Sequence, residues 1–599
     1  MDDVKQTYRR FRMRARRKVR KQTRHVTDIT LQADDSLDRH LFKRFGRLYG
    51  VRRFVAAWTL LVLFIGLAAL WQVRGLNAFY LKSAPVPGGV YREGLIGHFT
   101  TANPIFAVGS ADVSVARLVF SGLLKLAPGG ELVPDLASGY SVDDTGLVYT
   151  MSLRRDVTWH DGEPFTAADV VFTYSAIKNP EVKSSLQSGW SNVTVKAVDD
   201  YTVTFTLPNA LSAFEYSLTN GLLPEHILGA VAPADLRSST FNSVDPVGTG
   251  PFTYKLVEVL GDGITDRHEK ITLERNNNYY QKPANIEGVS IRTYRDEESM
   301  LEAFDEKEIS AMVGLQTISD AELQDGTVQT FNSPLSSQVM IFLNNSSTGL
   351  DDAKVRRALL LGTDTKTLRQ SIGYQLLESD SPFLRSHFTY DDKKVQATFD
   401  SNAANKLLDE AGWTRGPDGK RQKEGKELHL RLVSQSLTEY ATIVQGLQDQ
   451  WSKLGIGVDA ILQPEEDVQS GAIANHSYDV FLYGIALGPD PDVFAYWHST
   501  QADPRIKTRL NFSEYKNPKA DTALEAGRTR RDEELRKIKY EPFLDTWLAD
   551  TPAIALYQPR FLFVVRGTLE GYASGELNSP ADRFYSITDW LIRRDRTIK

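Results

Sequence analysis

The sequence contains no cysteine, and this absence is the first constraint on its chemistry. Disulfide bonds, thiolate metal sites, a cysteine nucleophile and a lipid-modified cysteine are therefore all excluded. The sequence also lacks the His-Glu-x-x-His, Gly-x-Ser-x-Gly and Gly-x-x-x-x-Gly-Lys-Ser/Thr patterns. Zinc hydrolases, serine hydrolases and P-loop nucleotide hydrolases are thus not indicated, and we expect no catalysis, no cofactor and no metal site.

Length and composition describe a large folded protein. The 599 residues exceed what one hydrophobic core can serve, and a prior of about 150 residues per domain predicts about four units. With 41% hydrophobic and 24% charged residues, the chain is not expected to be disordered. Strand-like and helix-like segments interleave along it, which predicts an α/β protein with several lobes.

Charge is distributed unevenly along the chain. Residues 1–53 hold 17 Lys and Arg against 6 Asp and Glu, a net charge of +11, so the remaining chain carries −17. The basic segment is expected to be a solvated cytoplasmic tail that contacts anionic lipid, and nucleic-acid binding is the alternative that we do not expect.

One long apolar run follows the basic tail. Residues 54–73 are uncharged and long enough, at about 1.5 Å per residue, to cross a hydrocarbon core of about 30 Å. Trp58 and Trp71 suit the two membrane interfaces. A cleaved signal peptide is the competing interpretation, but the run and the segment before it are both too long for one. The positive-inside bias then predicts a single-pass membrane protein whose C-terminal body is exported.

Local signals predict several elements of the exported part. Alternating or β-branched stretches at 148–153, 201–207, 428–433 and 478–483 predict strands. Thr166 followed by Asp169 predicts a capped helix start. In 437–454 one apolar stripe ends before Gly455, which predicts an amphipathic helix with a C-terminal glycine.

Two groups of residues invite a catalytic interpretation. His160 and Asp161 could form an acid/base pair, although Asp-Gly followed by Glu-Pro favours a turn. Asp490 and Asp492 flank Pro491 and could be paired carboxylates or metal ligands. Loop carboxylates near a ligand site, or a rigid turn, are favoured because no third acidic group lies nearby in sequence.

A series of short motifs runs through residues 88–592. The most specific stretches are 132–137 (LVPDLA), 143–150 (DDTGLVYT), 153–162 (LRRDVTWHDG) and 164–172 (PFTAADVVF). Shorter ones follow at 248–252 (GTGPF), 273–276 (LERN), 355–359 (VRRAL), 405–413 (NKLLDEAGW) and 454–456 (LGI). By these motifs and their order, residues 88–592 resemble the family 5 extracellular solute-binding proteins, whose members bind oligopeptides, dipeptides or nickel complexes.

The resemblance implies a two-lobed periplasmic-binding-protein-like clamp with an additional third domain, preceded by one transmembrane helix. We assign 1–53 to the cytoplasmic tail, 54–73 to the transmembrane helix and 74–88 to a linker. Lobe I is assigned to 89–130, 241–335 and 552–592, the extra domain to 131–240, and lobe II to 336–551. Such a clamp closes over its ligand by a population shift, because the closed form binds the solute better.

The resemblance also implies where the ligand lies. Peptide backbones in this family are held by strand-like hydrogen bonds, while side chains enter hydrated pockets. Two stretches are predicted to flank the ligand, and the residues assigned to them are Asn103, Gly109, Ser110, Ala111 and Asp112 in the first, and Tyr483, Gly484, Ile485, Ala486 and Leu487 in the second.

This chain departs from the family pattern at Leu487. Peptide binders commonly have an acidic residue at this position, where it pairs with the free amino terminus of the ligand. Asp490 or Asp492 is left to take that role. The favoured function is capture of peptides for an ABC-type importer, with permease and ATPase subunits as partners. A non-peptide solute, such as a metal chelate or an oligosaccharide, and a sensor or receptor on the same fold are the alternatives.

Overall fold

The computed structural model describes residues 52–261, 268–315, 326–506 and 509–598, so the predicted basic tail lies outside the described residues except for its last two. Helix α3 (Arg52–Tyr80) contains the predicted apolar run, and within the described residues it is the one helix long and apolar enough to cross a membrane. Strand β1 (Leu81–Val86) follows it and pairs with β24 (Arg593–Ile598). The predicted linker 74–88 is therefore mostly helix and strand, because no proline interrupts the helix before Pro85.

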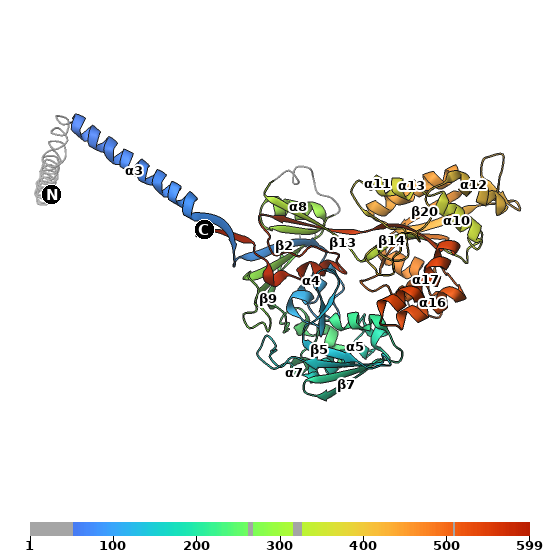
Figure 1. Cartoon of the computed structure of the whole chain (residues 1–599), viewed down its shortest axis with the longest axis horizontal. Coiled ribbons are helices and arrows are strands. Elements are labelled where there is room, and N and C mark those ends of the chain that lie inside the picture. The colour runs from blue at the N-terminus through green and yellow to red at the C-terminus, as the bar shows by residue number, and fades with distance from the viewer. Residues whose placement is uncertain (1–51, 262–267, 316–325, 507–508, 599) are drawn as a thin grey trace, which may run out of the picture. The chain divides into compact units, whose positions relative to one another are not determined.

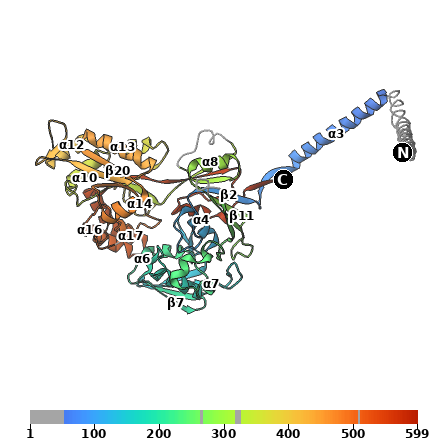
Figure 2. The ribbon, with the colours of Figure 1, turned by 180° about the vertical axis from the view of Figure 1, so that it is seen from behind.

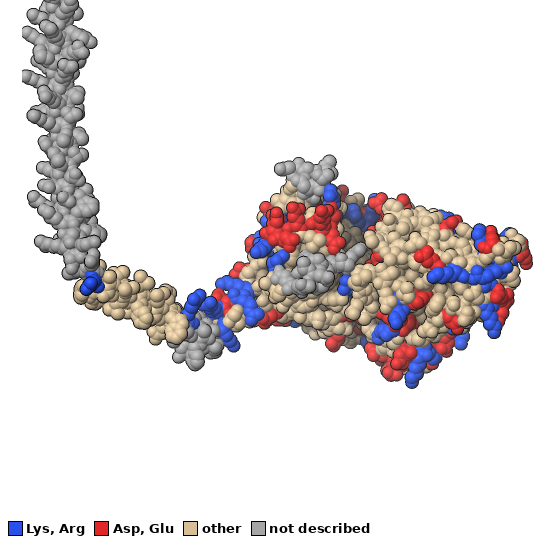
Figure 3. Space-filling model, turned by 90° about the horizontal axis from the view of Figure 1, so that it is seen from above, with Lys and Arg blue, Asp and Glu red and all other residues tan. Residues whose placement is uncertain are grey.

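A seven-stranded sheet lies at the centre of the first part of the body. Its strand order is β13-β23-β12-β2-β11-β10-β9, with β2 parallel to both β11 and β12. The strands are β2 (Val90–Ile96), β9 (Phe252–Leu260), β10 (His268–Arg275), β11 (Gly288–Tyr294), β12 (Ala311–Leu315), β13 (Val328–Pro334) and β23 (Arg560–Arg566). Helix α8 (Glu297–Asp305) covers one face and α4 (Ser110–Val119) the other (Figure 1). Acidic side chains gather over α8 (Figure 3).

Residues 124–242 add a smaller layer beside α4. The hairpin β3 (Leu124–Leu126) and β4 (Leu132–Pro134) leads into a four-stranded sheet of order β5-β6-β8-β7. Its strands are β5 (Ala137–Val142), β6 (Val148–Leu153), β7 (Thr194–Asp199) and β8 (Thr202–Thr206). The helical elements of this segment are α5 (Ala167–Lys178), α6 (Gln187–Trp190), η2 (Ser212–Thr219), α7 (Glu225–Leu228), η3 (Pro233–Ser238) and η4 (Thr240–Asn242). One hydrophobic core joins this layer to the seven-stranded sheet.

A six-stranded sheet organises the second part of the body. Its order is β15-β22-β14-β21-β19-β20, and the strands are β14 (Ser337–Leu343), β15 (Leu377–Glu378), β19 (His429–Gln435), β20 (Gly457–Gln463), β21 (Val480–Ala486) and β22 (Ala553–Gln558). Helices α10 (Ala353–Leu361), α11 (Thr365–Ser371), α12 (Ser401–Glu410) and α13 (Thr438–Lys453) lie on one side. Helices α16 (Pro518–Arg528) and α17 (Glu533–Asp550) lie on the other (Figures 1 and 2). Separate hydrophobic clusters fill the two faces.

Short elements complete the second part. They are the small sheet β16 (Thr414–Arg415), β17 (Arg421–Lys423) and β18 (Lys426–Glu427), and the helical turns α14 (Glu465–Asp467), η5 (Val468–Ile473), α15 (Phe494–Trp497) and η6 (Ser499–Ala502). Turns η7 (Pro580–Phe584) and η8 (Ile587–Asp589) return to the first part, where η7 contacts α4.

Two adjacent crossings connect the two large sheets. One runs from β13 to β14 through Leu335 and Ser336, and the other runs from β22 to β23 through Pro559. The Leu335 N–H donates to the Pro559 carbonyl at 2.9 Å, and the Gln558 amide donates to the Leu335 carbonyl at 2.8 Å. The predicted boundary at 552 needs correction, because β22 pairs with β14 and the chain crosses only at Pro559.

The local sequence signals are confirmed. Thr166 caps α5 in a capping box with Asp169. The apolar stripe of α13 is buried, and Gly455 follows the helix with a φ of 83°, which favours glycine. Strands β6, β8, β19 and β21 lie on the four predicted stretches, to within a few residues.

Candidate ligand-binding site

Strand β21 ends in an edge without a strand partner. It pairs with β14 along its whole length, from Val480 to Ala486, but β19 pairs with it only from Val480 to Leu482. On the β19 side, residues 483–486 therefore have no neighbouring strand among the described residues. This edge lies at the carboxyl ends of the parallel strands β19, β20 and β21, where open α/β sheets bind their ligands.

Alternation along β21 divides the predicted residues into two sets. One set faces the α17 side of the sheet and contains Tyr483, Ile485 and Leu487. Ile485 and Leu487 belong to the hydrophobic cluster on that side and are only 3% and 8% exposed. Ala486 is exposed and Gly484 is half-buried. The side chains of Ile485 and Leu487, two residues that the sequence assigned to the ligand, are thus part of the hydrophobic core, and contact of their backbone with a ligand stays a prediction.

Gly484 lies close to helix α13. A Cβ at this position would lie 2.9 Å from the Tyr440 hydroxyl, so a larger residue would displace that side chain. Tyr483 stacks on Phe481 with ring centroids 4.9 Å apart, and its hydroxyl accepts from the Gln469 amide at 3.0 Å. Gly484, Ala486 and the hydroxyl of Tyr483 are thus the predicted groups that lie at the open edge.

Asp490 and Asp492 both have arginine partners within the protein. Asp490 accepts two bonds of 2.7 Å from the Arg536 guanidinium, and Asp492 Oδ2 lies 3.0 Å from Arg528 Nη2. Each aspartate side chain is only 11% exposed. Burial raises the pKa of Asp492, and Arg528 opposes that shift. Neither carboxylate is therefore free to neutralise a ligand ammonium in this structure.

The first predicted stretch surrounds the start of α4. Asp112 is 2% exposed, and its carboxylate accepts from the N–H groups of Thr100 and Thr101 and from the Thr100 hydroxyl. Asn103 is fully buried and donates to the Asn242 side chain at 2.8 Å. These two side chains hold the loop together.

The other residues of this stretch differ in exposure. Ala111 is buried, Gly109 is half-buried at the N-terminal end of α4, and Ser110 is exposed. Val108 beside them is 73% exposed. Within the described residues, no hydrogen bond or ion pair joins 103–112 to 483–492, so the structure does not bring the two stretches into direct polar contact.

Sequence reasoning missed the carboxylate at the start of α13. Glu439 accepts from the hydroxyls of Tyr374, at 2.5 Å, and of Tyr557. The Arg560 guanidinium lies over the Tyr374 ring, 4.2 Å from its centroid. Burial, together with Glu439, raises the pKa values of both tyrosines. The partners lie far away in sequence, so no local pattern could have revealed this cluster.

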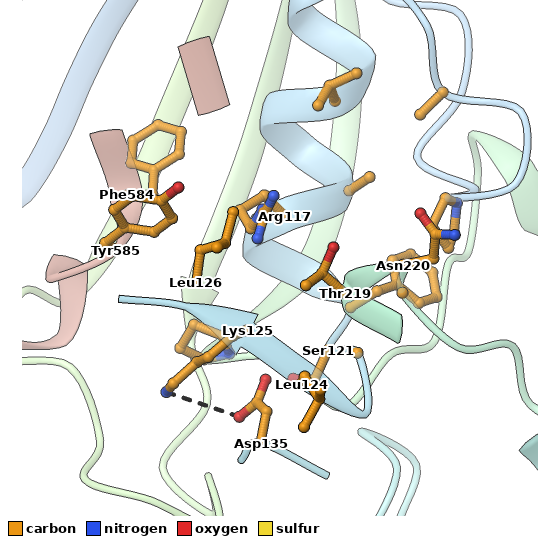
Figure 4. Close-up of a pocket in the computed structure, with 18 of the residues that line it drawn as sticks. Arg117, Ser121, Leu124, Lys125, Leu126, Asp135, Thr219, Asn220, Phe584 and Tyr585 are labelled. Carbon is orange, nitrogen blue, oxygen red and sulfur yellow. Dashed lines mark ion pairs between the residues drawn. The ribbon is translucent and has the colours of Figure 1, made fainter. Parts of the chain in front are cut away.

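A cavity of about 220 Å³ lies at the C-terminal end of α4. Figure 4 shows Arg117, Lys125 and Tyr585 on its walls. Lys125 Nζ lies 3.7 Å from Asp135 Oδ1, and Arg117 Nη2 lies 2.9 Å from an oxygen of Asp582, so both cations are already neutralised. None of the predicted ligand-binding residues lines this cavity. Within the described ranges, no group of three or more His, Asp and Glu side chains could hold a metal ion.

His160 is a structural residue. Its Nδ1 accepts from the Gly248 N–H at 3.2 Å, so its Nε2 carries the proton and donates to the Gly250 carbonyl at 3.0 Å. Gly162, at a φ of 99°, completes the turn that the sequence favoured. Burial lowers the pKa of His160 to about 4, although the hydrogen bond to the Gly250 carbonyl and the charge of Asp161 oppose that shift.

We expect acid to weaken the fold through His160. Between pH 6.5, the ordinary pKa, and about pH 4, the His160 side chain is protonated in the unfolded chain but neutral in the folded chain. The free energy of unfolding therefore falls as the pH falls. The loss for a full shift is roughly 3 kcal/mol at the acid end of that window. Urea unfolding of wild type and His160→Gln at several pH values measures it. The control is His429→Gln, at an exposed histidine. Equal pH dependence of the free energy of unfolding in wild type and His160→Gln would contradict this assignment.

The fold defines a class of protein. Two α/β lobes joined by adjacent crossings, with a third small domain, form the clamp of periplasmic-type binding proteins. The model of the bacterial extracellular solute-binding proteins, family 5 Middle, matches residues 131–504, more than half of the chain. The chain belongs to this family of solute-binding proteins.

Several known proteins are similar over most of the chain. The oligopeptide-binding protein AppA of Bacillus subtilis is 28% identical over 571 residues, which cover 89% of this chain and 98% of AppA. The structure of AppA from Bacillus subtilis in complex with a nonapeptide matches with a TM-score of 0.69 and 26% identity, covering 85% of this chain and 100% of the other. NikZ from Campylobacter jejuni in complex with Ni(L-His) also matches, with a TM-score of 0.69, 25% identity and coverage of 84% and 99%.

Proposed function

We propose that this chain captures peptides outside the cytoplasm and delivers them to an ABC-type importer. The observation that carries the proposal is the open edge of β21 at residues 483–486. An extended peptide can add to such an edge as a further strand, with its backbone held by hydrogen bonds. AppA, with its bound nonapeptide, supports this choice of ligand.

Capture requires only a change of conformation. The two crossings allow the lobes to close over the ligand, and the ligand stabilises the closed form because it contacts both lobes there. The ligand leaves with its covalent bonds unchanged. Permease and ATPase subunits then recognise the closed form and supply the energy for import.

We further propose that α3 anchors the body to the membrane with the N-terminus in the cytoplasm. The length and apolar composition of residues 53–74 support a spanning helix, and the excess of Lys and Arg before it supports this orientation. A cleaved signal sequence is the alternative. Mass spectrometry of the protein isolated from whole cells distinguishes the two, because a cleaved chain would lack the apolar run as well as residues 1–53.

A non-peptide solute is the second candidate ligand. Its support is the arrangement around β21, where Leu487 is buried and Asp490 and Asp492 are paired with arginines. A peptide with a free amino terminus therefore lacks the usual carboxylate partner at this position. NikZ with its Ni(L-His) ligand illustrates that a protein of this fold can bind a metal chelate.

The test is binding of peptide pools to the full chain in lipid nanodiscs. We expect a pool of mixed peptides to raise the melting temperature, since a ligand at 100 times its Kd adds about 2.7 kcal/mol. Ala486→Trp places a bulky side chain beside the open edge and should abolish the shift, whereas Val259→Trp, exposed on the edge strand β9, should not. The peptide proposal is wrong if no pool shifts the melting temperature but nickel-histidine does.

A further inference from the structure

The corner between α16 and α17, residues 528–536, holds both aspartates of the predicted site. Arg528 bonds Asp492 and lies over the Phe494 ring, 4.1 Å from its centroid. Arg536 bonds both oxygens of Asp490 and also donates to the Gly527 carbonyl at 3.2 Å. Burial disfavours the charge of Arg536, but the bonds to Asp490 outweigh burial and raise its pKa. The loop that follows β21 is therefore fixed to this corner by two arginines.

The same corner contacts the 131–240 segment. The Ser212 hydroxyl donates to the Arg528 carbonyl at 2.9 Å, and Arg531 Nη2 lies 3.1 Å from Glu215 Oε1. The second oxygen of Glu215 accepts from the Tyr140 hydroxyl of β5 at 2.5 Å. We call this contact between η2 and the corner the polar seam.

The aspartate loop also lies close to the 131–240 segment. Tyr216 of η2 is half-buried, and burial, followed by the charge of Asp490, raises its pKa to about 12. A Cβ on Gly130, in the turn between β3 and β4, would lie 3.3 Å from Pro489. The loop 488–492 is thus placed between the open edge of β21 and the surface of the 131–240 segment.

We propose that Asp490 and Asp492 are positioning residues, which hold the 528–536 corner so that the polar seam can close the clamp. The inference rests on the proposed function, since closure traps the ligand. Neither aspartate need touch the ligand. Both aspartates instead connect two places: the end of β21, where the ligand binds, and the polar seam, which keeps the lobes together. A ligand that orders the loop 488–492 therefore stabilises the polar seam.

Closure can be measured without any ligand. Because the sequence has no cysteine, the changes Lys196→Cys and Lys519→Cys create a unique pair of label sites, one on β7 and one on α16, both exposed. Fluorescence energy transfer between the labels in full-length protein in nanodiscs reports the ratio of closed to open forms. Raising KCl from about 0.01 M to about 1 M shortens the Debye length from about 30 Å to about 3 Å.

We expect wild type to open by roughly two- to five-fold in this ratio as salt rises, the range for a partly exposed ion pair. Glu215→Gln should open the clamp at low salt and remove the salt response. Asp492→Asn should do the same, and combining both should add little, because they act through one contact. Glu541→Gln removes an ion pair with Lys394 that stays within one lobe and should leave the ratio unchanged.

The results that overturn the proposal are equally defined. Two results would show that the aspartates do not act through the polar seam. One is that the effects of Glu215→Gln and Asp492→Asn are additive. The other is that neither variant changes the ratio of closed to open forms. If Asp492→Asn does not fold, Arg531→Gln, at a side chain 50% exposed, tests the same seam in combination with Asp492→Glu. Absence of peptide binding with an intact salt response would refute the proposed function and leave the seam standing.

Discussion

Gly248→Ala is expected to leave little folded protein. A Cβ at this position would lie 1.9 Å from the Val119 carbonyl oxygen, far inside van der Waals contact. The obstacle is backbone at the end of α4, where Val119 is fully buried, so no side-chain rotation can relieve it. The nearby Gly250 N–H also donates to that carbonyl at 2.8 Å. We expect a loss above about 4 kcal/mol in the free energy of unfolding.

Circular dichroism during urea titration measures the effect on Gly248→Ala. Gly139→Ala is the matched control, because neither glycine has a positive φ and the new Cβ of Gly139→Ala would have nothing within 4 Å. That control should change stability by less than about 1 kcal/mol. Similar urea midpoints for the two variants would mean that the end of α4 can move, contrary to the packing described.

Arg583→Met should cost about 3–5 kcal/mol of stability, because it leaves the Glu93 carboxylate buried without a countercharge. Both side chains are fully buried, and Arg583 makes two hydrogen bonds to Glu93. Arg583 also donates to the Ser114 hydroxyl of α4 at 3.0 Å. The variant should therefore also loosen α4, the helix that begins at the exposed Ser110.

The double variant Glu93→Met with Arg583→Met should recover much of this loss, since it removes both charges together. Arg505→Met is the control, because Arg505 is 89% exposed in its pair with Asp503 and such pairs contribute about 0–1 kcal/mol. Unfolding midpoints in urea give all three values. An Arg583→Met variant as stable as Arg505→Met would contradict the buried pair.

Much of the fold could be predicted from short stretches of sequence. Thr166 and Asp169 determine a helix start within four residues, and the stripe of α13 determines which face is buried. The residue at which the chain leaves the six-stranded sheet could not be predicted in this way. β22 is buried along its whole length and its residues suit either sheet, and only its pairing with β14 moves the crossing from 552 to Pro559.

The site was harder to predict than the fold for the same physical reason. Asp490 and Asp492 lie outside helices and strands, as the sequence favoured, but their partners lie 46 and 36 residues away, at Arg536 and Arg528. A sequence shows that a carboxylate is present and does not show whether an arginine already neutralises it. Asn103 and Asp112 illustrate the same ambiguity, since short polar side chains serve loop structure and ligand binding equally well.

Proline at the second crossing has a mechanical consequence. Pro559 has no N–H and a fixed φ, so β22 and β23 cannot continue as one hydrogen-bonded strand through that point. Its carbonyl is instead occupied by Leu335, which interrupts the neighbouring strand at the same level. The β13–β23 ladder therefore ends at Pro334 and Arg560, and the β14–β22 ladder begins only at Val339 and Tyr557. We expect the lobes to bend at this level, because both ladders can stay intact when the chain moves there.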